Sequence, residues 1–515
     1  MRNKGSYKVL IALLLVVLIF PLVNLLIQAF QTEGKGVWSV LEHSTLWGKT
    51  IGLSLLVVAL STIWAFGAAY VLARFPSLLK TVFEWMLMLP LAIPPFIMAY
   101  CYKQFLGPFG TAHSMFDVFF ETDHYLLLAL CLSFSLFPYS YIFLKSTLHK
   151  QTPLYSNASA VLGVAGLKRF FTVILPLNRK AIFGGGIVIA MEVFNNYGAV
   201  KYLGLETVST FIIDQYNPMQ PDVSLGMSFW LVLLVLLLLQ LESKWGANAR
   251  FEGVASSAYS WTEQRKPVVA FWAYGAVFIL VLLSFLLPVL LLISWAWRER
   301  AYSFDDELLS AVSMSATLGL LSAAAIVLVA LLFQVGKRYT KGRGKRGLQW
   351  LTLLSNAGYA VPGAVLGLSI LLILSFISHQ LGVLITGGVG ILVYAYLIRF
   401  LSIGNNGIQS AYAKIPNELM SASQVLGKSW WHSFWAVDFK LLAPSLLGIG
   451  IIAFVDVLKE LPLTMMFQSF NFETLALTAY GLMETDGGVY KASIPSLLII
   501  CLGLIPVYLI HKKVK

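Results

Sequence analysis

Long apolar segments alternate with short polar segments along nearly the whole chain. A helix needs about 20 mainly apolar residues to cross a hydrocarbon layer of about 30 Å, and these segments reach or approach that length. We predict one spanning helix from each, at about 9–30, 50–73, 83–102, 125–144, 181–200, 225–241, 268–295, 310–335, 350–376, 383–403, 442–463 and 492–510. The pattern therefore predicts an all-α polytopic membrane protein with about twelve transmembrane helices.

Features of the first half of the chain recur in the second half at an offset of 264 residues. The triplet Val-Leu-Gly stands at 161–163 and again at 425–427, and Glu192 is matched by Asp456. Six spans repeated twice give both halves the same orientation, related by an axis along the membrane normal. We therefore predict two parallel six-helix repeats with a polar, basic cytoplasmic segment between them. The predicted parts are a first repeat at 1–242, a linker at 243–267 and a second repeat at 268–515.

Composition excludes several other classes of protein. Hydrophobic residues make up 58% of the 515 residues and charged residues only 12%, which is too few to cover soluble domains. The three cysteines lie in apolar segments without CxxC spacing, and the seven histidines form no zinc-type or proton-relay cluster. We expect no disulfide framework, no metal site and no cofactor.

Lysine and arginine are concentrated in alternate connecting segments. With the N-terminus inside, the cytoplasmic segments hold 27 of the 36 Lys and Arg residues, as the positive-inside rule requires. This bias accounts for the net charge of +12, so nucleic acid binding is not expected. We predict that both termini and the loops at 145–180 and 404–440 are cytoplasmic.

Two of these cytoplasmic loops carry a shared motif, in Asn157–Leu177 and Ser421–Pro444. Both resemble the EAA loop of ABC-importer permeases, in which E-A-A-x-x-x-G is followed after nine residues by I-x-L-P. The first copy keeps the spacing from Gly163 to Leu175 and Pro176. Small residues would let a short helix press closely into a partner, and the glycine and proline would mark its ends.

The loops also depart from the motif. Asn157 and Ser421 replace its glutamate, and Phe439-Lys440 replaces Leu-Pro in the second copy. The resemblance nevertheless implies that both loops contact an ATPase. The residues implied in this contact are Asn157, Ala158, Ser159, Gly163 and Pro176 in the first copy, with Ser421, Ala422, Ser423 and Gly427 in the second.

Further segments narrow the resemblance. Leu89–Tyr100, Met191–Gly204 and Asp456–Thr464 resemble the fused two-repeat permeases of iron(III) importers in the binding-protein-dependent transport family. This implies a multi-pass permease in the bacterial cytoplasmic (inner) membrane, driven by two cytoplasmic ATP-binding subunits. An external or periplasmic binding protein would deliver the substrate. Permeases for phosphonates and thiamine are close relatives, so these substrates remain alternatives.

Charged and amide residues within the spans are candidates for a translocation path, because charges are costly in lipid and normally face a partner or a cavity. Glu192 and Asp456 are matched by the duplication, and the nearby Gly198 and Pro462 suggest broken helix ends. The alternative for Lys459 and Glu460 is that they mark a span end and pair with nearby charges. The candidate path residues are Glu192, Asn195, Asn196, Asp456, Lys459 and Glu460.

The chain has no complete nucleotide-binding motif. Both near-matches to a P-loop, at 48–50 and 427–429, lack its first glycine. ATP hydrolysis is therefore assigned to a partner, and the chain is predicted not to be an enzyme. An ion-coupled secondary transporter could also have twelve spans in two repeats, but it would not need the paired loops. A membrane-embedded enzyme is the third possibility, and no cluster of nucleophile, base or metal ligands supports it.

Overall fold

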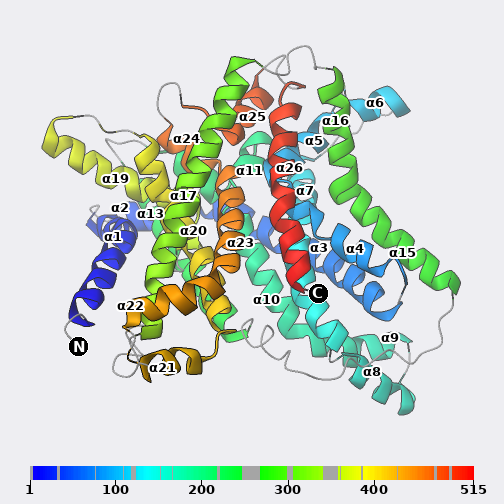
Figure 1. Cartoon of the computed structure of the whole chain (residues 1–515). Helices are drawn as coiled ribbons and strands as arrows, with labels where there is room; N and C mark the ends of the chain where they lie inside the picture. Colours follow the sequence, from blue (N-terminus) through cyan, green and yellow to red (C-terminus); the bar gives the residue numbers. More distant parts are fainter. Residues whose placement is uncertain are drawn as a thin grey trace. The chain divides into compact units, whose positions relative to one another are not determined.

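The structure is a computed structural model of the chain (Figure 1). It describes residues 4–31, 35–75, 77–107, 110–117, 123–150, 152–164, 166–216, 221–245, 267–298, 305–339, 358–359, 361–383, 385, 387–425, 427, 429–468, 472–485 and 490–514. All regular secondary structure in these residues is helical. The prediction of an all-α polytopic membrane protein is confirmed.

The helices of the first half of the chain are α1 (Lys4–Gln31), α2 (Lys35–Glu42), α3 (Ser44–Arg74), α4 (Lys80–Met86), η1 (Leu89–Ala92), α5 (Pro95–Leu106), α6 (Thr111–Phe116), α7 (His124–Lys150), α8 (Thr152–Val161), α9 (Gly166–Arg169), η2 (Phe170–Ile174), α10 (Leu175–Phe194), α11 (Gly198–Tyr202), α12 (Val208–Asp214) and α13 (Asp222–Trp245). Of these, η1 is a 3₁₀ turn and η2 is a π-helical turn.

The helices of the second half are α15 (Pro267–Val281), η3 (Leu282–Leu286), α16 (Leu287–Arg298), α17 (Asp306–Tyr339), α19 (Gly363–Leu381), α20 (Val389–Tyr412), α21 (Asn417–Val425), α22 (Trp430–Ser433), η5 (Phe434–Asp438), α23 (Phe439–Leu458), α24 (Pro462–Phe467), α25 (Leu475–Glu484) and α26 (Ser493–Val514). Both η3 and η5 are π-helical turns.

Nine continuous helical stretches in the described residues are long and apolar enough to cross a membrane. They are Ser44–Arg74, His124–Leu148, Gly166–Phe194, Asp222–Leu241, Pro267–Arg298, Asp306–Arg338, Gly363–Leu381, Val389–Tyr412 and Trp431–Leu458. Shorter apolar stretches lie at Leu18–Gln31 and Ser493–Leu509 and overlap the first and last predicted spans. The number of twelve spans therefore stays a prediction.

The third predicted span is not one helix. It is divided into α4 with η1 and then α5, because Ile93 and Pro94 have extended backbone (ψ 113° and 141°). A residue that precedes a proline is forced out of the helical region, and Pro94 is itself followed by Pro95. The second repeat has the same feature at Pro362 (φ −56°, ψ 143°), directly before α19. The first residues of the ninth predicted span, 350–357, lie outside the described residues.

The fifth and eleventh predicted spans end in breaks. In the first repeat α10 stops at Phe194 and α11 begins at Gly198, and in the second α23 stops at Leu458 and α24 begins at Pro462. These are the interruptions that the sequence predicts from Gly198 and Pro462. The hydroxyl of Ser209 donates a hydrogen bond to the carbonyl of Phe194, which lies at the first break.

The helices gather into two compact units that do not follow chain order. One contains Met1–Ser39, Ile212–Val232 and Phe304–Gly481, and the other contains Val40–Phe211, Leu233–Ser303 and Leu482–Lys515. The first unit is built on α17, α20 and α23, and the second on α3, α7 and α10. These are the corresponding helices of the two repeats. The predicted repeat boundaries at 242 and 268 remain a prediction about the sequence, and most of the linker lies outside the described residues.

Close helix contacts in each core depend on small residues. A Cβ on Gly185 of α10 would stand 2.4 Å from Ser140 Oγ on α7, and one on Gly404 of α20 would stand 2.6 Å from Ala330 Cβ on α17. Such contacts let helix backbones approach closely in lipid, where packing rather than hydrophobicity drives association. The cytoplasmic loop predicted in each repeat is therefore attached to a tightly packed three-helix core.

Candidate functional site

The first predicted loop forms a helix–turn–helix segment. Helix α8 ends in a Schellman motif, in which Gly163 N donates to Ala160 O (3.0 Å) and Val164 N donates to Ser159 O (3.0 Å). Gly163 has φ +77°, and a Cβ there would meet no atom within 4 Å. The glycine is therefore required by backbone conformation. The expectation that a glycine marks the helix end is confirmed.

Pro176, by contrast, does not end a helix, so that part of the expectation is wrong. Helix α9, the π turn η2 and α10 run on without a break from Gly166 to Phe194. In the π turn the N–H of Leu175 donates to the carbonyl of Phe170, five residues earlier. Pro176 follows as the second residue of α10, where its missing N–H is tolerated.

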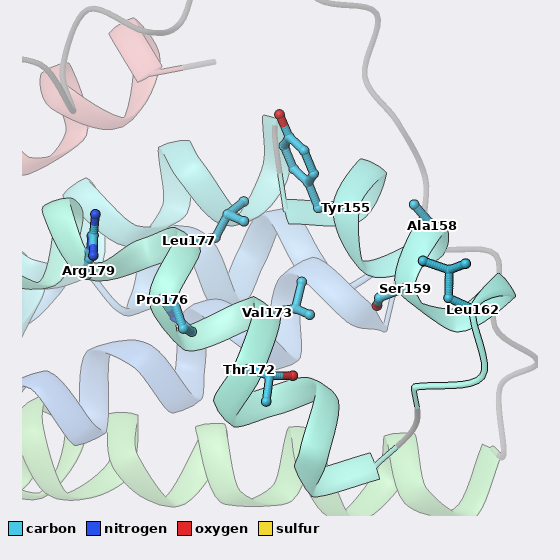
Figure 2. Close-up of a pocket in the computed structure, with 9 residues that line it drawn as sticks. All are labelled: Tyr155, Ala158, Ser159, Leu162, Thr172, Val173, Pro176, Leu177 and Arg179. Carbon is cyan, nitrogen blue, oxygen red and sulfur yellow. The ribbon is translucent and has the colours of Figure 1, made fainter.

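A groove of about 510 Å³ lies between α8 and the start of α10 (Figure 2). Ser159 and Leu162 stand on the α8 side, and Val173 and Pro176 stand on the η2 and α10 side. Its full lining is Tyr155, Ala158, Ser159, Leu162, Thr172, Val173, Pro176, Leu177 and Arg179. Sequence reasoning assigned Ala158, Ser159 and Pro176 to the ATPase contact, and Val173 stands at the isoleucine position of the motif. It gave no role to the other five, because the motif specifies no residue type at their positions.

Apolar side chains at the turn are strongly exposed. Val161 is 89% exposed and Leu162 is 81% exposed, and neither belongs to a candidate membrane span. Exposed apolar residues outside the lipid region are typical of a surface that binds another protein. The surrounding segment 152–180 contains four basic residues and no acidic residue. The first loop therefore offers an apolar contact surface in a basic setting.

The second loop repeats this construction with different side chains. Helix α21 is followed by Gly427, whose φ is +72°, and Val425 is 87% exposed, close to the 89% of Val161 in the first copy. Ala422 is exposed, whereas the hydroxyls of Ser423 and Ser433 lie 2.6 Å apart and join α21 to α22. Ser421 lies on α21.

Aromatic rings distinguish the second loop from the first. The rings of Trp431 and Trp435 are 5.7 Å apart, edge to face, and the ring of Phe439 lies 4.7 Å from that of Trp435. Phe434 is buried beneath them, while the two tryptophans are about half exposed. The two copies therefore share a backbone design but differ in the surface that they present.

Within the loops, Ser159 is buried and its hydroxyl donates to the carbonyl of Ser156 (2.8 Å), so it supports α8 internally. Asn157 is half-buried, whereas Ala158, Gly163 and Pro176 are exposed. The position at which the motif has glutamate is thus occupied by a neutral side chain at the edge of the surface.

The candidate path residues lie at the two helix breaks. Glu192 is half-buried on α10, and Asn195 caps that helix. The carbonyl oxygen of the Asn196 side chain accepts a hydrogen bond from Ala199 N (3.2 Å) at the start of α11. In the other unit Asp456 is half-buried on α23, and Lys459 caps it.

Glu460 has a structural partner. Its Oε2 lies 3.0 Å from Nε of Arg399, and both side chains are almost fully buried. Its other oxygen accepts from Leu463 N (3.4 Å), and its carbonyl accepts from the hydroxyl of Thr464 (2.7 Å) at the start of α24. For Glu460, pairing with a nearby charge is the better supported of the two interpretations given above. The sequence alone marks Arg399 as a charged residue within an apolar span, but it does not indicate Glu460 as its partner.

In the described residues, no group of three or more His, Cys, Asp or Glu side chains could hold a metal ion. The candidate path residues instead form helix caps, hydrogen bonds and one buried ion pair at the two broken helices. The arrangement can place charged groups at membrane depth, and the two loops can bind a protein outside the spans.

Two repeated bundles of membrane-length helices, each extended by a helix–turn–helix loop of the same design, define an integral membrane transport component. Residues 61–241 and 338–515 both match the family "Binding-protein-dependent transport system inner membrane component". The chain belongs to this family, with the family domain present twice. The prediction of a fused two-repeat permease is confirmed, and the chain is a multi-pass inner membrane protein.

The similar proteins include permeases of full and half length. The chain is 24% identical over 461 residues to "Fe(3+)-transport system permease protein FbpB 2" of Haemophilus influenzae, covering 86% of this chain and 85% of that protein. It is 22% identical over 529 residues to "Ferric transport system permease protein FbpB" of Actinobacillus pleuropneumoniae, covering 95% and 75%. "Putrescine transport system permease protein PotI" of Escherichia coli is 22% identical over 236 residues, covering 45% of this chain and 83% of that protein.

Proposed function

We propose that the chain is the membrane permease of an ATP-driven importer for iron(III). Two cytoplasmic ATP-binding subunits dock on the two loops, and an external binding protein delivers the substrate to a path between the repeats. Both termini and both loops face the cytoplasm. The substrate is inferred from the names of the two ferric-transport relatives described above, which match most of the chain.

The observation that carries the proposal is the repeated loop. Both copies end their first helix at a glycine in the left-handed region and leave a valine almost fully exposed beside it, at Val161 and Val425. An apolar surface built twice, outside the spans, suits a partner that is itself present twice. The groove between α8 and α10 has room for side chains that project from such a partner.

The orientation of the loops rests on charge. The four basic residues of 152–180 and the bias of Lys and Arg over the chain favour a cytoplasmic position for these loops. ATP is available on that side. A subunit that hydrolyses ATP can therefore reach both loops in this orientation.

The path is proposed to follow the two helix breaks. Glu192 and Asp456 occupy matched positions near the ends of α10 and α23, followed by Asn195, Asn196 and Lys459. Carboxylates would lower the barrier for a cation such as ferric iron. Glu460 contributes through its ion pair with Arg399.

The test is reconstitution of the chain with the ATPase and binding protein from its own organism. The proposal expects co-purification of the ATPase, and uptake of radioactive iron into vesicles that requires both ATP and the binding protein. Phosphonate, thiamine, putrescine and sulfate serve as competing substrates. Uptake of one of these without iron would refute the substrate, and uptake driven by an ion gradient without ATP would refute the importer.

A further inference from the structure

One arginine connects both ends of the second loop to the helix bundle. Arg338 lies in the last turn of α17, and its Nε stands 3.5 Å from Oδ2 of Asp438 at the end of η5. Its Nη2 donates to the carbonyl of Pro416 (3.5 Å), directly before α21. Pro416 precedes the loop helices and Asp438 follows them. A single guanidinium therefore closes the base of the loop.

The same side chain also contacts a third segment. Its guanidinium lies 4.7 Å from the centre of the Tyr412 ring, at the end of α20. Beside it, Nζ of Lys337 is 3.3 Å from Oε1 of Gln409 on α20. The side chains of Arg338 and Asp438 are only 8% and 3% exposed, so solvent screens this ion pair weakly. The planar fork of arginine suits several simultaneous partners.

The first loop is attached differently. Arg74 is the last residue of α3 and matches Arg338 in the last turn of α17 at an offset of 264 residues, but its guanidinium lies against the rings of Tyr70 and Phe75. A neutral link there joins α10 to α7. Asn178 of α10 donates to the carbonyl of Ile174 (2.8 Å) and accepts from the hydroxyl of Thr147 on α7 (2.6 Å).

We propose that Arg338 is a positioning residue that couples the second loop to α17 and α20. A force on the loop reaches α17 through the Asp438 and Pro416 contacts and α20 through the Tyr412 ring, so the loop and the bundle move as one body. In the first loop, the corresponding connection to the bundle includes the neutral hydrogen bond between Asn178 and Thr147. This inference rests on the proposed function, because it assumes that an ATPase moves the loop.

The experiment uses the complete complex in lipid vesicles and measures both ATP hydrolysis and substrate uptake. Arg338→Gln and Asp438→Asn should each raise the ATP consumed per substrate transported by about tenfold, a typical size for coupling between two sites. The ATPase should still co-purify, because neither residue lies at the exposed apolar surface. The double variant should be no worse than Arg338→Gln alone, because the arginine change already removes the interaction with Asp438.

Two further variants make the test specific. Arg338→Lys keeps the positive charge beside Asp438, but its single ammonium group cannot contact both Asp438 and Pro416. It should therefore show coupling between that of Arg338→Gln and that of the wild type. Arg74→Gln, the matched change in the first repeat, should leave the ratio unchanged. If Arg338→Gln fails to insert into the membrane, the ratios measured for Arg338→Lys and Asp438→Asn, which change the site least, test the inference.

The inference is overturned if Asp438→Asn and Arg338→Lys both keep the wild-type ratio, or if Arg74→Gln disturbs it equally. The failure of the proposed function looks different. In that case the wild-type complex itself shows no uptake that requires ATP.

Discussion

Removal of the carboxylate at Glu460 should destabilise the protein strongly. Oε2 of Glu460 and Nε of Arg399 are 3.0 Å apart, and the two side chains are only 7% and 5% exposed. The other carboxylate oxygen of Glu460 accepts a hydrogen bond from Leu463 N. Glu460→Gln keeps the shape and an acceptor for Leu463 but leaves the Arg399 charge buried without its counterion. Breaking a buried ion pair in this way costs about 3–5 kcal/mol.

The lower end of that range applies here. The glutamine oxygen can still accept the hydrogen bond from Leu463 N, and an unfolded chain that remains in the membrane finds other partners for its polar groups. We therefore expect a loss of about 3 kcal/mol in the free energy of unfolding. Replacing both partners by methionine should cost less than the single change, because no charge is then left buried.

The assay is detergent-induced unfolding of the purified chain, followed by helical circular dichroism and by elution as a single species. Glu418→Gln on α21, an exposed position, is the matched control and should change stability little. If Glu460→Gln lowered the free energy of unfolding by less than about 1 kcal/mol, as for an exposed pair, the pair would not be a structural element. Glu460 would then return to the set of path residues.

Three further outcomes are expected. Gly163→Ala should strain the left-handed turn by about 1–2 kcal/mol and reduce uptake. The control Gly275→Ala, on the open face of α15 with negative φ, should leave uptake unchanged. Equal uptake by the two variants would remove the turn from the coupling mechanism. Lys168→Cys should react with an impermeant thiol reagent only from the cytoplasmic side, and labelling from outside would invert the proposed topology. The double variant Glu192→Gln, Asp456→Asn should lose uptake while keeping its ATPase contact, and wild-type uptake would exclude both from the path.

The sequence was sufficient for features that depend on local chemistry. Apolar length predicts the spans, and Pro462 and Gly198 predict breaks because their effects on the backbone do not depend on tertiary partners. The glycine at 163 predicts a helix end for the same reason. The two consecutive prolines at 94 and 95 also indicate a break in the sequence, but the apolar run around them favoured the prediction of one continuous span.

Features that depend on tertiary contacts were not predictable. Asp438 looks like an isolated acid in the loop, and nothing in its neighbourhood indicates Arg338, which is 100 residues earlier and packs beside it only after folding. Pro176 in the sequence predicts a helix end, yet the helix continues through the π turn that precedes it. The groove lining likewise combines α8 with α10, which no single motif spans.

The discontinuous units have a consequence for dividing the polypeptide. Helix α1 packs on α17 and α19 of the later repeat, while α15 packs on α3 and α4 of the earlier one. Expressing residues 1–245 and 267–515 as separate chains would leave each fragment with a core that lacks its covering helix. The fragments should be unstable alone and should rescue each other when made together, each supplying the other's missing helix. The connection between the repeats would then serve mainly to fix equal stoichiometry.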